Sequence, residues 1–508
     1  MFRRILIANR GEIALRVIRT AREMGIETVA VYSDTDRRAL HTRMAHVAVP
    51  LGGDVPAETY LSIEKMIEAA RSSGAEAVHP GYGFLSENPD FARAVAGAGL
   101  AWIGPPPEAI AVMGDKIRSR QVVAAAGVPV VPGTVEPLED ADAAVAAAES
   151  AGYPVALKAA AGGGGKGIRV VEDAAGIASA FRAAAGEARS AFGDGRLYLE
   201  RYLERPRHVE VQVLFDGRGS GVHLGERECS IQRRHQKLIE ESPSVVVDEG
   251  LRARMGEVAL AAARAVDYEG AGTVEFLWSN AGGRPEFFFL EMNTRLQVEH
   301  PVTEMVTGLD LVREQIRIAA GEPLGYGQEA VRFHGHAIEV RLNAEDPQRG
   351  FLPSVGTIQN LRLPGGPGVR LDTALYSGLE VGTTYDPMLG KLIVWAPDRD
   401  AAIRRMRRAL EELSIGGVRT SAPAALLVLS DERFTRGEFD TGFLDGFDLT
   451  PPEHWEVLVA AAAVIYRRRM ATRRALSGSP RSRAWLDRAR TLDADRVRRA
   501  GRSGGGEA

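Results

Sequence analysis

The sequence predicts a multidomain protein of the α/β and α+β classes, and three observations support this fold class. The chain has 508 residues, enough for several domains of about 150 residues each. Short apolar strands alternate with helices over residues 1–110, which is typical of a parallel sheet covered on both faces. A strand-rich region with turn sequences such as Pro364-Gly-Gly-Pro367 occupies residues 331–446.

The N-terminal region is predicted to be an α/β domain over residues 1–113. Its expected strands are 5–8, 27–32, 75–79 and 101–104, and its expected helices are 12–24, 59–71 and 88–98. The turn after the first strand reads Ala8-Asn-Arg-Gly-Glu12 rather than Gly-x-Gly-x-x-Gly, which excludes a nicotinamide-binding Rossmann site. Gly104-Pro-Pro-Pro107 ends the pattern, and a central region follows to residue 330. Residues 447–508 are predicted as a helix near 455–466 and then an Arg/Gly-rich tail.

Composition favours a globular protein of a reducing compartment. Hydrophobic residues make up 45% and charged residues 26% of the chain, which are ordinary globular values. The single cysteine, Cys229, cannot form an internal disulfide, so we expect a cytoplasmic protein. Met1 runs almost directly into an apolar strand, which leaves no room for a signal peptide, and the apolar stretch 457–465 is too short for a membrane span.

Charge is concentrated at the C-terminal end. The formal net charge is −4, but residues 466–508 contain 13 arginines and only four acidic residues. A nucleic-acid-binding scaffold acting through this tail is the non-enzymatic alternative. Because Trp485 is the only aromatic residue after Tyr466, the tail lacks the stacking side chains of such proteins, and we expect it to dock a partner protein instead.

Lysine is rare in this chain. Only six of the 63 basic residues are lysines, namely Lys65, Lys116, Lys158, Lys166, Lys237 and Lys391. An ammonium is a compact point charge that the wide guanidinium fork of arginine does not imitate. The lysines that remain are therefore candidates for specific contacts, apart from Lys65, which lies on a polar helical stretch.

The strongest local motif is a glycine-rich loop that follows Lys158. Five glycines and Lys166 occupy residues 162–167, and backbone N–H groups of such a loop can surround phosphate oxygens. The loop is no Walker A motif, because Ala160 and Gly167 stand where that motif requires Gly and Ser/Thr. The strand sequence Ile168-Arg-Val-Val follows it, which predicts a flap between two strands that folds over a nucleotide.

A predicted hairpin brings two carboxylates together. Strands near 272–279 and 286–293 flank a turn, and a hairpin centred on Gly283 places Glu275 opposite Glu291. Like charges directly opposite on a sheet are destabilising. A Mg²⁺ ion between them would resolve the repulsion, with Asn293 as a third oxygen ligand. The alternative is that both carboxylates point to solvent.

The polar run after this hairpin has strict period-two spacing. In an extended chain, one face would carry Glu291, Asn293, Arg295, Gln297 and Glu299. This face would offer a cation for an anionic substrate and a carboxylate base. A further charged run at 225–237 contains no aromatic residue, which is typical of a solvated loop. It combines Gln232, His235 and Lys237, which suits recognition of an oxyanion or a nucleotide. No base lies next to Cys229 in sequence, so we interpret it as a buried thiol.

Together these motifs resemble the biotin carboxylase subunit of biotin-dependent carboxylases, of the acyl-CoA or pyruvate carboxylase type. The matching stretches are 7–14, 79–88, 113–116, 158–167, 226–237, 291–301, 339–346 and Tyr385-Asp386. The resemblance covers about residues 3–445 and implies an ATP-grasp architecture. It implies a Rossmann-like N-terminal domain, a central ATP-grasp domain at 114–330 with a mobile glycine-rich lid at about 131–203, and a biotin carboxylase C-terminal domain at 331–446.

By this resemblance the protein carboxylates biotin with bicarbonate and ATP, through carboxyphosphate. It implies that ATP is bound by Lys116, Lys158, Gly163, Gly164, Gly165, Lys166, Gly167, Glu200, Arg201, Tyr202, Leu203, His208, Gln232, His235, Glu275 and Glu291. Glu275, Glu291 and Asn293 would hold Mg²⁺ or Mn²⁺. Lys237, Arg295, Gln297 and Val298 would bind bicarbonate, with Glu299 as the base. Arg341 would stabilise the biotin enolate, and Tyr82 would lie near the biotin.

The resemblance also predicts partners. No lysine follows a methionine, so the Ala-Met-Lys-Met biotinylation motif is missing. We therefore expect biotin on a separate carrier protein, a separate carboxyltransferase and a homodimer. The carboxyl acceptor, an acyl-CoA or pyruvate, stays open, as does another ATP-grasp ligase of the carbamoyl-phosphate or purine type. Arg419-Thr-Ser421 departs from the Lys-Thr-Asn common in the family, with no expected effect.

Overall fold

The computed structural model describes residues 1–160, 168–449 and 464–468. The chain divides into two compact units, Met1–Phe447 and Asp448–Ala508. Residues 464–468 are helical, and the rest of the helix predicted at 455–466 lies outside the described residues, as does the tail. Among the residues that are described, no helix combines the length and apolar character needed to cross a bilayer.

The N-terminal region is a parallel five-stranded sheet in the order β3-β2-β1-β4-β5. Its strands are β1 (Arg4–Ile7), β2 (Glu27–Tyr32), β3 (Val47–Pro50), β4 (Ala77–His79) and β5 (Ala101–Trp102). Its helices are α1 (Gly11–Glu23), α2 (Leu40–Met44), α3 (Ile63–Ser73), α4 (Pro89–Gly97) and α5 (Pro107–Gly114). The expected elements are confirmed to within a few residues, and β3, α2 and α5 are additions. Apolar residues of β1 are fully buried, as the predicted two-sided cover requires.

The lid is a small three-stranded sheet in the order β7-β6-β8 with two helices. It contains α7 (Ala141–Ala151), β6 (Val155–Ala159), β7 (Ile168–Val171), α8 (Ala174–Phe192) and β8 (Leu197–Arg201). Strands β6 and β7 pair antiparallel, which confirms the expected strands on either side of the glycine loop. The loop itself, residues 161–167, lies outside the described residues.

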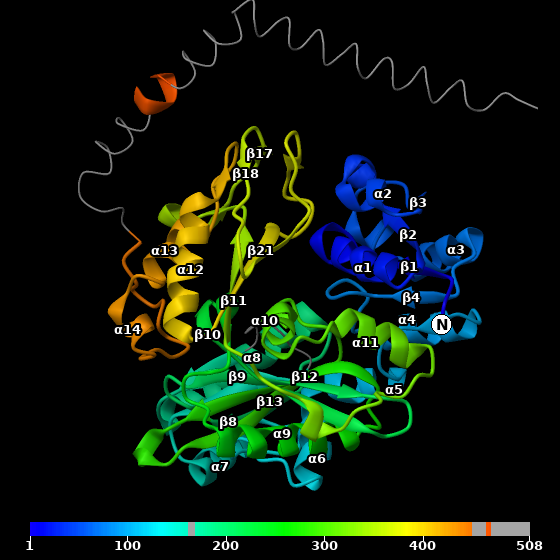
Figure 1. Ribbon diagram of the computed structural model, residues 1–508. Coiled ribbons are helices and arrows are strands. Elements are labelled where there is room, and N and C mark those ends of the chain that lie inside the picture. Colours follow the sequence, from blue (N-terminus) through cyan, green and yellow to red (C-terminus); the bar gives the residue numbers. More distant parts are fainter. Residues whose placement is uncertain (161–167, 450–463, 469–508) are drawn as a thin grey trace, which may run out of the picture. The chain divides into compact units, whose positions relative to one another are not determined.

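An antiparallel eight-stranded sheet forms the centre of the first unit, in the order β13-β12-β9-β10-β11-β14-β21-β19 (Figure 1). Its strands are β9 (Arg207–Phe215), β10 (Gly221–Arg233), β11 (Gln236–Ser242), β12 (Gly270–Ser279), β13 (Glu286–Asn293), β14 (His336–Asn343), β19 (Val369–Thr373) and β21 (Met388–Ala396). The accompanying helices are α6 (Lys116–Ala125), α9 (Glu249–Arg264), α10 (His300–Thr307) and α11 (Leu311–Ala319). Because β11 pairs with β14, this sheet runs across the domain boundary predicted at 330, and the predicted boundaries inside Met1–Phe447 stay predictions.

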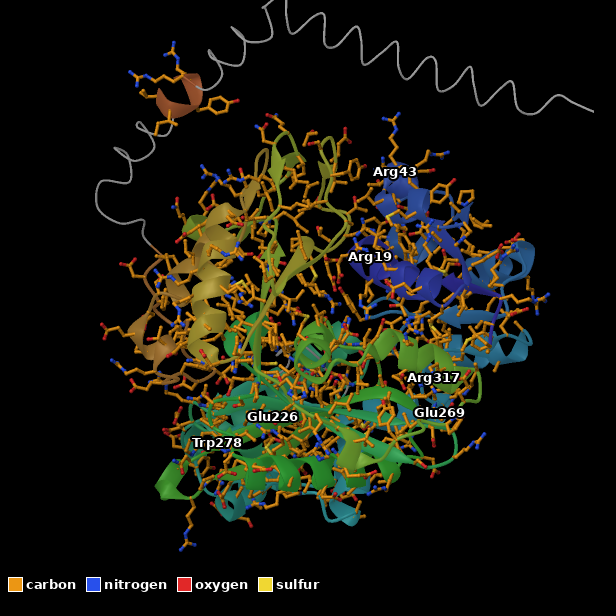
Figure 2. All side chains as sticks on the ribbon, in the orientation of Figure 1. Arg19, Arg43, Glu226, Glu269, Trp278 and Arg317 are labelled. Atoms are coloured by element: carbon orange, nitrogen blue, oxygen red, sulfur yellow. The ribbon has the colours of Figure 1, made fainter. Side chains whose placement is uncertain are left out.

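The C-terminal part packs α12 (Arg399–Glu412) on strands β14 and β21 around buried apolar residues. Short elements complete it: β15 (Glu345–Asp346), β16 (Leu352–Pro353), β17 (Gly356–Thr357), β18 (Leu361–Arg362), β20 (Glu380–Val381), β22 (Ser414–Ile415), α13 (Ala422–Val428) and α14 (Glu432–Thr435). Turns of 3-10 helix occupy Thr35–Arg38, Pro56–Glu58, Ala281–Gly283, Gln328–Ala330 and Pro347–Arg349. Arg19 lies on α1 of the N-terminal region (Figure 2). Its Nη1 is 4.0 Å from Asp372 Oδ1 of β19, so the two regions are in contact.

Two local expectations differ from the structure. The extended face predicted from Glu291 to Glu299 is wrong beyond Asn293, because β13 ends there and the chain turns into α10 at His300. The turn nevertheless keeps these side chains together. The charged run at 225–237 is the buried strand β10 and the start of β11, in which Glu226, Arg227 and Glu228 are almost fully buried.

Candidate active site

A cavity of about 1110 Å³ is lined by residues of the N-terminal region, the lid and the central sheet. The predicted site residues on its wall are Tyr82, Lys116, Lys158, Glu200, Arg201, Tyr202, Leu203, His208, Gln232, His235, Lys237, Glu275, Glu291, Asn293, Arg295, Gln297, Val298 and Arg341. Glu299 is buried just behind this wall, and residues 163–167 lie outside the described residues. The fold thus gathers residues that are more than 250 positions apart in sequence, from Tyr82 to Arg341.

Glu299 is held between two cations. Its Oε1 accepts from Lys237 Nζ at 2.6 Å, and its Oε2 accepts from Arg341 Nη2 at 2.9 Å. Burial alone would raise the pKa of Glu299, but Lys237, Arg341 and Arg227 outweigh it and hold this pKa well below its usual range. The carboxylate is therefore ionised at neutral pH, which is the state that a proton acceptor needs.

Glu275 and Glu291 face each other across β12 and β13, as predicted. The register shifts between Glu275 and Phe276, so a bulge restores the alignment that the turn near Gly283 alone would not give. Asn293 donates to Glu291 Oε1 at 3.3 Å, and Lys116 Nζ lies 3.3 Å from Glu291 Oε2. Two carboxylates and an amide oxygen on one cavity wall are a donor set that fits Mg²⁺.

His208 lies beside this carboxylate pair, a contact that sequence spacing did not reveal. Its Nε2 is 3.0 Å from Glu275 Oε2, and Lys237 Nζ donates to Glu275 Oε1 at 3.0 Å. Burial would raise the pKa of Glu275, but Lys237 and His208 lower it well below its usual range. Glu275 thus carries its negative charge even though its side chain is buried.

The lid and the β10–β11 turn bring further polar side chains to the cavity. Lys158 on β6 forms an ion pair with buried Glu200 on β8, and Arg120 Nη1 reaches the other oxygen of Glu200 at 3.2 Å. The β10–β11 turn holds Arg234 and His235 at φ values of 49° and 64°, a conformation that few side chains adopt, and it directs His235 to the cavity. Burial and the positive charge of Lys158 lower the pKa of His235, so it is a neutral donor or acceptor there.

Several partners of these residues were missed by the sequence analysis. Glu87 of the N-terminal region accepts from Arg295 Nε at 2.8 Å. Glu210 on β9 stands opposite Glu275 and accepts from Lys237 at 2.6 Å. The alternation of His208, Glu210 and Gln212 with valines on this strand was the signal that could have indicated Glu210.

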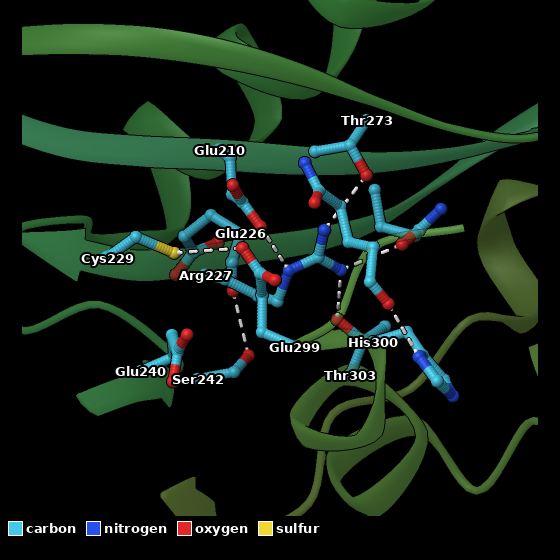
Figure 3. A network of polar contacts seen from close by, with 12 residues as sticks. Glu210, Glu226, Arg227, Cys229, Glu240, Ser242, Thr273, Glu299, His300 and Thr303 are labelled. Carbon is cyan, nitrogen blue, oxygen red and sulfur yellow. Dashed lines mark hydrogen bonds and ion pairs between the residues drawn. The ribbon is translucent and has the colours of Figure 1, made fainter. Parts of the chain in front are cut away.

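Arg227 is the centre of a buried polar network (Figure 3), which reaches the cavity residue Lys237 through Glu210. Its fully buried guanidinium donates to Glu210 Oε1 at 2.5 Å, Gln212 Oε1 at 2.7 Å, Thr273 Oγ1 at 2.9 Å and Thr303 Oγ1 at 3.0 Å. Cys229 Sγ lies 3.9 Å from Glu299 Oε1, and burial raises the pKa of this thiol well above its usual value. A neutral buried thiol is a poor nucleophile, which agrees with its structural interpretation.

Glu240 is a second carboxylate on Arg341 and gives a prediction for pH dependence. It accepts from Arg341 Nε at 2.5 Å, and it faces Glu339 on the neighbouring strand. Burial and Glu299 outweigh Arg341 and raise the pKa of Glu240 to about 7. A carboxyl group whose pKa is raised in the folded state adds to the free energy of unfolding below its unfolded pKa of about 4.3. This contribution is lost as pH rises to about 7. We expect the wild-type free energy of unfolding to fall between pH 5 and 8 more steeply than that of Glu240→Gln, measured by urea unfolding.

Glu241 supplies the matched control, because it is equally buried but lies on the other face of β11 with Arg399 and His336. Burial would raise its pKa, but Arg399 and His336 lower it to about 2. Its contribution is therefore complete above the unfolded carboxyl pKa of about 4.3 and is lost only below it. Glu241→Gln should leave the slope between pH 5 and 8 unchanged. Equal slopes for wild type and Glu240→Gln would contradict the assignment.

Two antiparallel strands joined by a glycine-rich sequence, together with a sheet that carries paired carboxylates and several cations, define an ATP-grasp enzyme. Comparison with protein families agrees. Residues 1–110 match "Biotin carboxylase, N-terminal domain", residues 115–326 match "Carbamoyl-phosphate synthase L chain, ATP binding domain", and residues 339–446 match "Biotin carboxylase C-terminal domain".

Relatives cover most of the chain. A pyruvate carboxylase subunit of Methanothermobacter thermautotrophicus is 52% identical over 447 residues, which are 88% of this chain and 90% of the relative. The propionyl-CoA carboxylase alpha chain of Ruegeria pomeroyi is 49% identical over 494 residues, covering 92% of this chain and 72% of the relative. A similar solved structure is the biotin carboxylase domain dimer of Hydrogenobacter thermophilus 2-oxoglutarate carboxylase, in complex with MgADP, ADP and bicarbonate. Its TM-score is 0.84 at 49% sequence identity, and the match covers 88% of this chain and 98% of that chain. The chain belongs to the biotin carboxylase family.

Proposed function

We propose that this chain uses ATP to carboxylate biotin with bicarbonate, the biotin being carried by a separate protein. The observation that carries this proposal is Glu299, an ionised buried carboxylate between Lys237 and Arg341, next to the cavity that contains Glu275 and Glu291. Family membership supports the same reaction. Bicarbonate is a poor nucleophile until it loses its proton, and a carboxylate in this place can accept that proton.

The roles of the individual residues follow from charge. Lys237 and Arg295 attract bicarbonate, with Gln297 and Val298 beside them on the same wall. When a bound anion draws Lys237 and Arg341 away from Glu299, the proton affinity of Glu299 rises, and it takes the proton of bicarbonate. The resulting carbonate attacks the γ-phosphorus of ATP to form carboxyphosphate and ADP. Carboxyphosphate breaks into CO₂ and phosphate, and the released phosphate takes the N–H proton of the biotin ureido group. The resulting biotin enolate, stabilised by Arg341, attacks CO₂ through its nitrogen to form carboxybiotin, and Tyr82 lines this side of the cavity.

The remaining residues position ATP. Lys116, Lys158 and His235 line the cavity, with Glu200 to Leu203 beside them and Lys166 and Gly163–Gly167 expected over the phosphates. His208 and Gln232 complete this part of the wall. Glu275, Glu291 and Asn293 would hold Mg²⁺ or Mn²⁺, which neutralises phosphate charge when bound.

The partner proteins are proposed from the chemistry of the reaction and from the relatives of this chain. A biotin carrier protein and a carboxyltransferase must supply and use the product, and a homodimer is proposed because the structurally similar 2-oxoglutarate carboxylase domain is described as a dimer. We propose an acyl-CoA carboxylase, with the biotin-carboxylating subunit of a two-subunit pyruvate carboxylase as the alternative, since relatives of both kinds are about equally similar. A cytoplasmic location is supported by the single free cysteine.

The test is ATP hydrolysis by the purified chain with Mg²⁺ and bicarbonate, with and without free biotin. We expect a rate that depends on bicarbonate and rises with biotin. Phosphate release that is indifferent to biotin would instead indicate another ATP-grasp ligase.

A truncated chain tests whether the Arg-rich tail docks a partner. A stop codon after residue 449 removes the tail, and assembly of the complex with the carrier protein is then measured.

A further inference from the structure

Lys391 on β21 is one of the six lysines, yet it belongs to none of the groups predicted to bind ATP, metal or bicarbonate. Its side chain is completely buried. Burying an ammonium is costly unless it is paired and hydrogen-bonded, so its contacts indicate what it does.

The ammonium of Lys391 joins three distant segments of the chain. Its Nζ donates to the backbone carbonyl of Val298 at 2.8 Å and lies 3.3 Å from Glu12 Oε1 on α1. It also lies 5.7 Å from the centre of the Tyr82 ring. Tyr82 in turn donates its hydroxyl to Glu12, so the three side chains form one cluster.

The Val298 carbonyl lies in the segment whose geometry decides bicarbonate binding. Residues 294–299 belong to neither β13 nor α10, so a regular hydrogen-bond ladder does not fix them. Side chains hold two successive carbonyls instead: His300 Nδ1 lies 2.7 Å from the Gln297 oxygen, and Lys391 binds the Val298 oxygen. The Val298 carbonyl shares its peptide plane with the N–H of Glu299, so its anchoring also orients the proposed base.

A lysine suits this position better than an arginine. The direct contacts of its Nζ are one carbonyl, one carboxylate and one aromatic ring, which a compact ammonium can satisfy. A guanidinium would bring five N–H donors in a rigid plane into the same buried space and leave several of them unpaired. This explains why lysine stands here in a chain that otherwise prefers arginine.

We propose that Lys391 is a positioning residue that holds residues 297–299 in the geometry required to bind bicarbonate, and that Glu12 and Tyr82 link this segment to the biotin side of the cavity. This proposal rests on the proposed function, because it concerns the same bicarbonate site.

The test measures bicarbonate-dependent ATP hydrolysis by Lys391→Met without biotin. We expect the KM for bicarbonate to rise about tenfold or more, equivalent to about 1.4 kcal/mol, while the KM for ATP stays within about twofold of wild type. Lys391→Arg, which keeps the charge but not the shape, should be intermediate. Lys65→Met is the matched control, because Lys65 also binds backbone carbonyls, of Leu51 and Glu58, but lies away from the cavity wall.

The double variant Glu12→Gln/Lys391→Met separates positioning from stability. It removes both charges of the Lys391–Glu12 pair, so it should recover part of the thermal stability lost in Lys391→Met, since an uncompensated buried charge is costly. The recovery is partial because buried Glu339 and Asp372 still lose the nearby ammonium. The KM of the double variant for bicarbonate should stay high, because Val298 still lacks its donor. A wild-type KM for bicarbonate in either variant, or recovery of KM together with stability in the double variant, would overturn the proposal. An unmutated chain whose ATP hydrolysis ignores bicarbonate would overturn the proposed function itself.

Discussion

Glu299→Gln is expected to lower biotin-dependent ATP hydrolysis by roughly 10²- to 10⁴-fold, the usual contribution of a general base. The amide fills the same volume but cannot accept the proton of bicarbonate. Lys237 and Arg341, which both bind the carboxylate, lose a counter-charge but stay next to the cavity. The defect should therefore appear in kcat, with a smaller change in the KM for ATP. Steady-state phosphate release at saturating bicarbonate measures it.

Glu226→Gln is the matched control for this prediction. Glu226 is also a nearly fully buried carboxylate and also pairs with an arginine, Arg252 at 2.7 Å, but it is absent from the cavity wall. Its loss should affect stability more than kcat. If Glu299→Gln retained more than about a tenth of the wild-type kcat, the proton acceptor would have to be another group.

Arg227→Met is expected to lower the free energy of unfolding by about 3 to 5 kcal/mol, as measured by urea unfolding. The guanidinium makes four hydrogen bonds in a fully buried position, and its removal leaves Glu210 and Gln212 without that partner (Figure 3). A buried carboxylate that loses its cation carries the desolvation cost of its charge with less compensation. Glu210 still accepts from Lys237, which reduces the loss in the free energy of unfolding.

Two further variants define the origin of this effect. Arg227→Lys keeps a positive charge near Glu210 but cannot reach all four acceptors, so it should be intermediate. Arg218→Met removes an exposed arginine from the β9–β10 turn and should change stability by less than about 0.5 kcal/mol. An Arg227→Met protein within about 1 kcal/mol of wild type would show that the buried network carries little net stability, as the cost of desolvation sometimes allows.

Much of the candidate site was predictable because its signals are local. The pairing of Glu275 with Glu291 was predicted from the hairpin sequence, but in the structure it depends on a bulge between Glu275 and Phe276, which the sequence analysis did not predict. The two strands on either side of the glycine loop were also predicted, and β6 and β7 confirm them, while the flap itself stays a prediction. The extended interpretation of Glu291 to Glu299 failed beyond Asn293 because alternation of polar residues is also produced by a turn whose side chains converge on one cavity.

The charged run at 225–237 shows that local sequence does not reveal whether charged residues are buried. Six charged residues and His235 within 13 positions suggested a polar loop, but Glu226, Arg227 and Glu228 lie in a buried strand. Each is neutralised by a partner from a different part of the chain: Arg252, Glu210 and Arg207 respectively. Burial of charge depends on partners that only the fold brings close, so no local pattern can indicate it.

The sequence by itself determined the alternating N-terminal sheet, the strands on either side of the glycine loop, the paired carboxylates and the family resemblance, because each depends on residues near one another in the chain. Only the tertiary structure decided that Lys237 and Arg341 meet Glu299, that Glu87 holds Arg295, and that Lys391 joins Val298 to Glu12. Such contacts arise where strands and helices from separate regions pack together. Electrostatic interaction depends on distance and burial, which the order of residues does not specify.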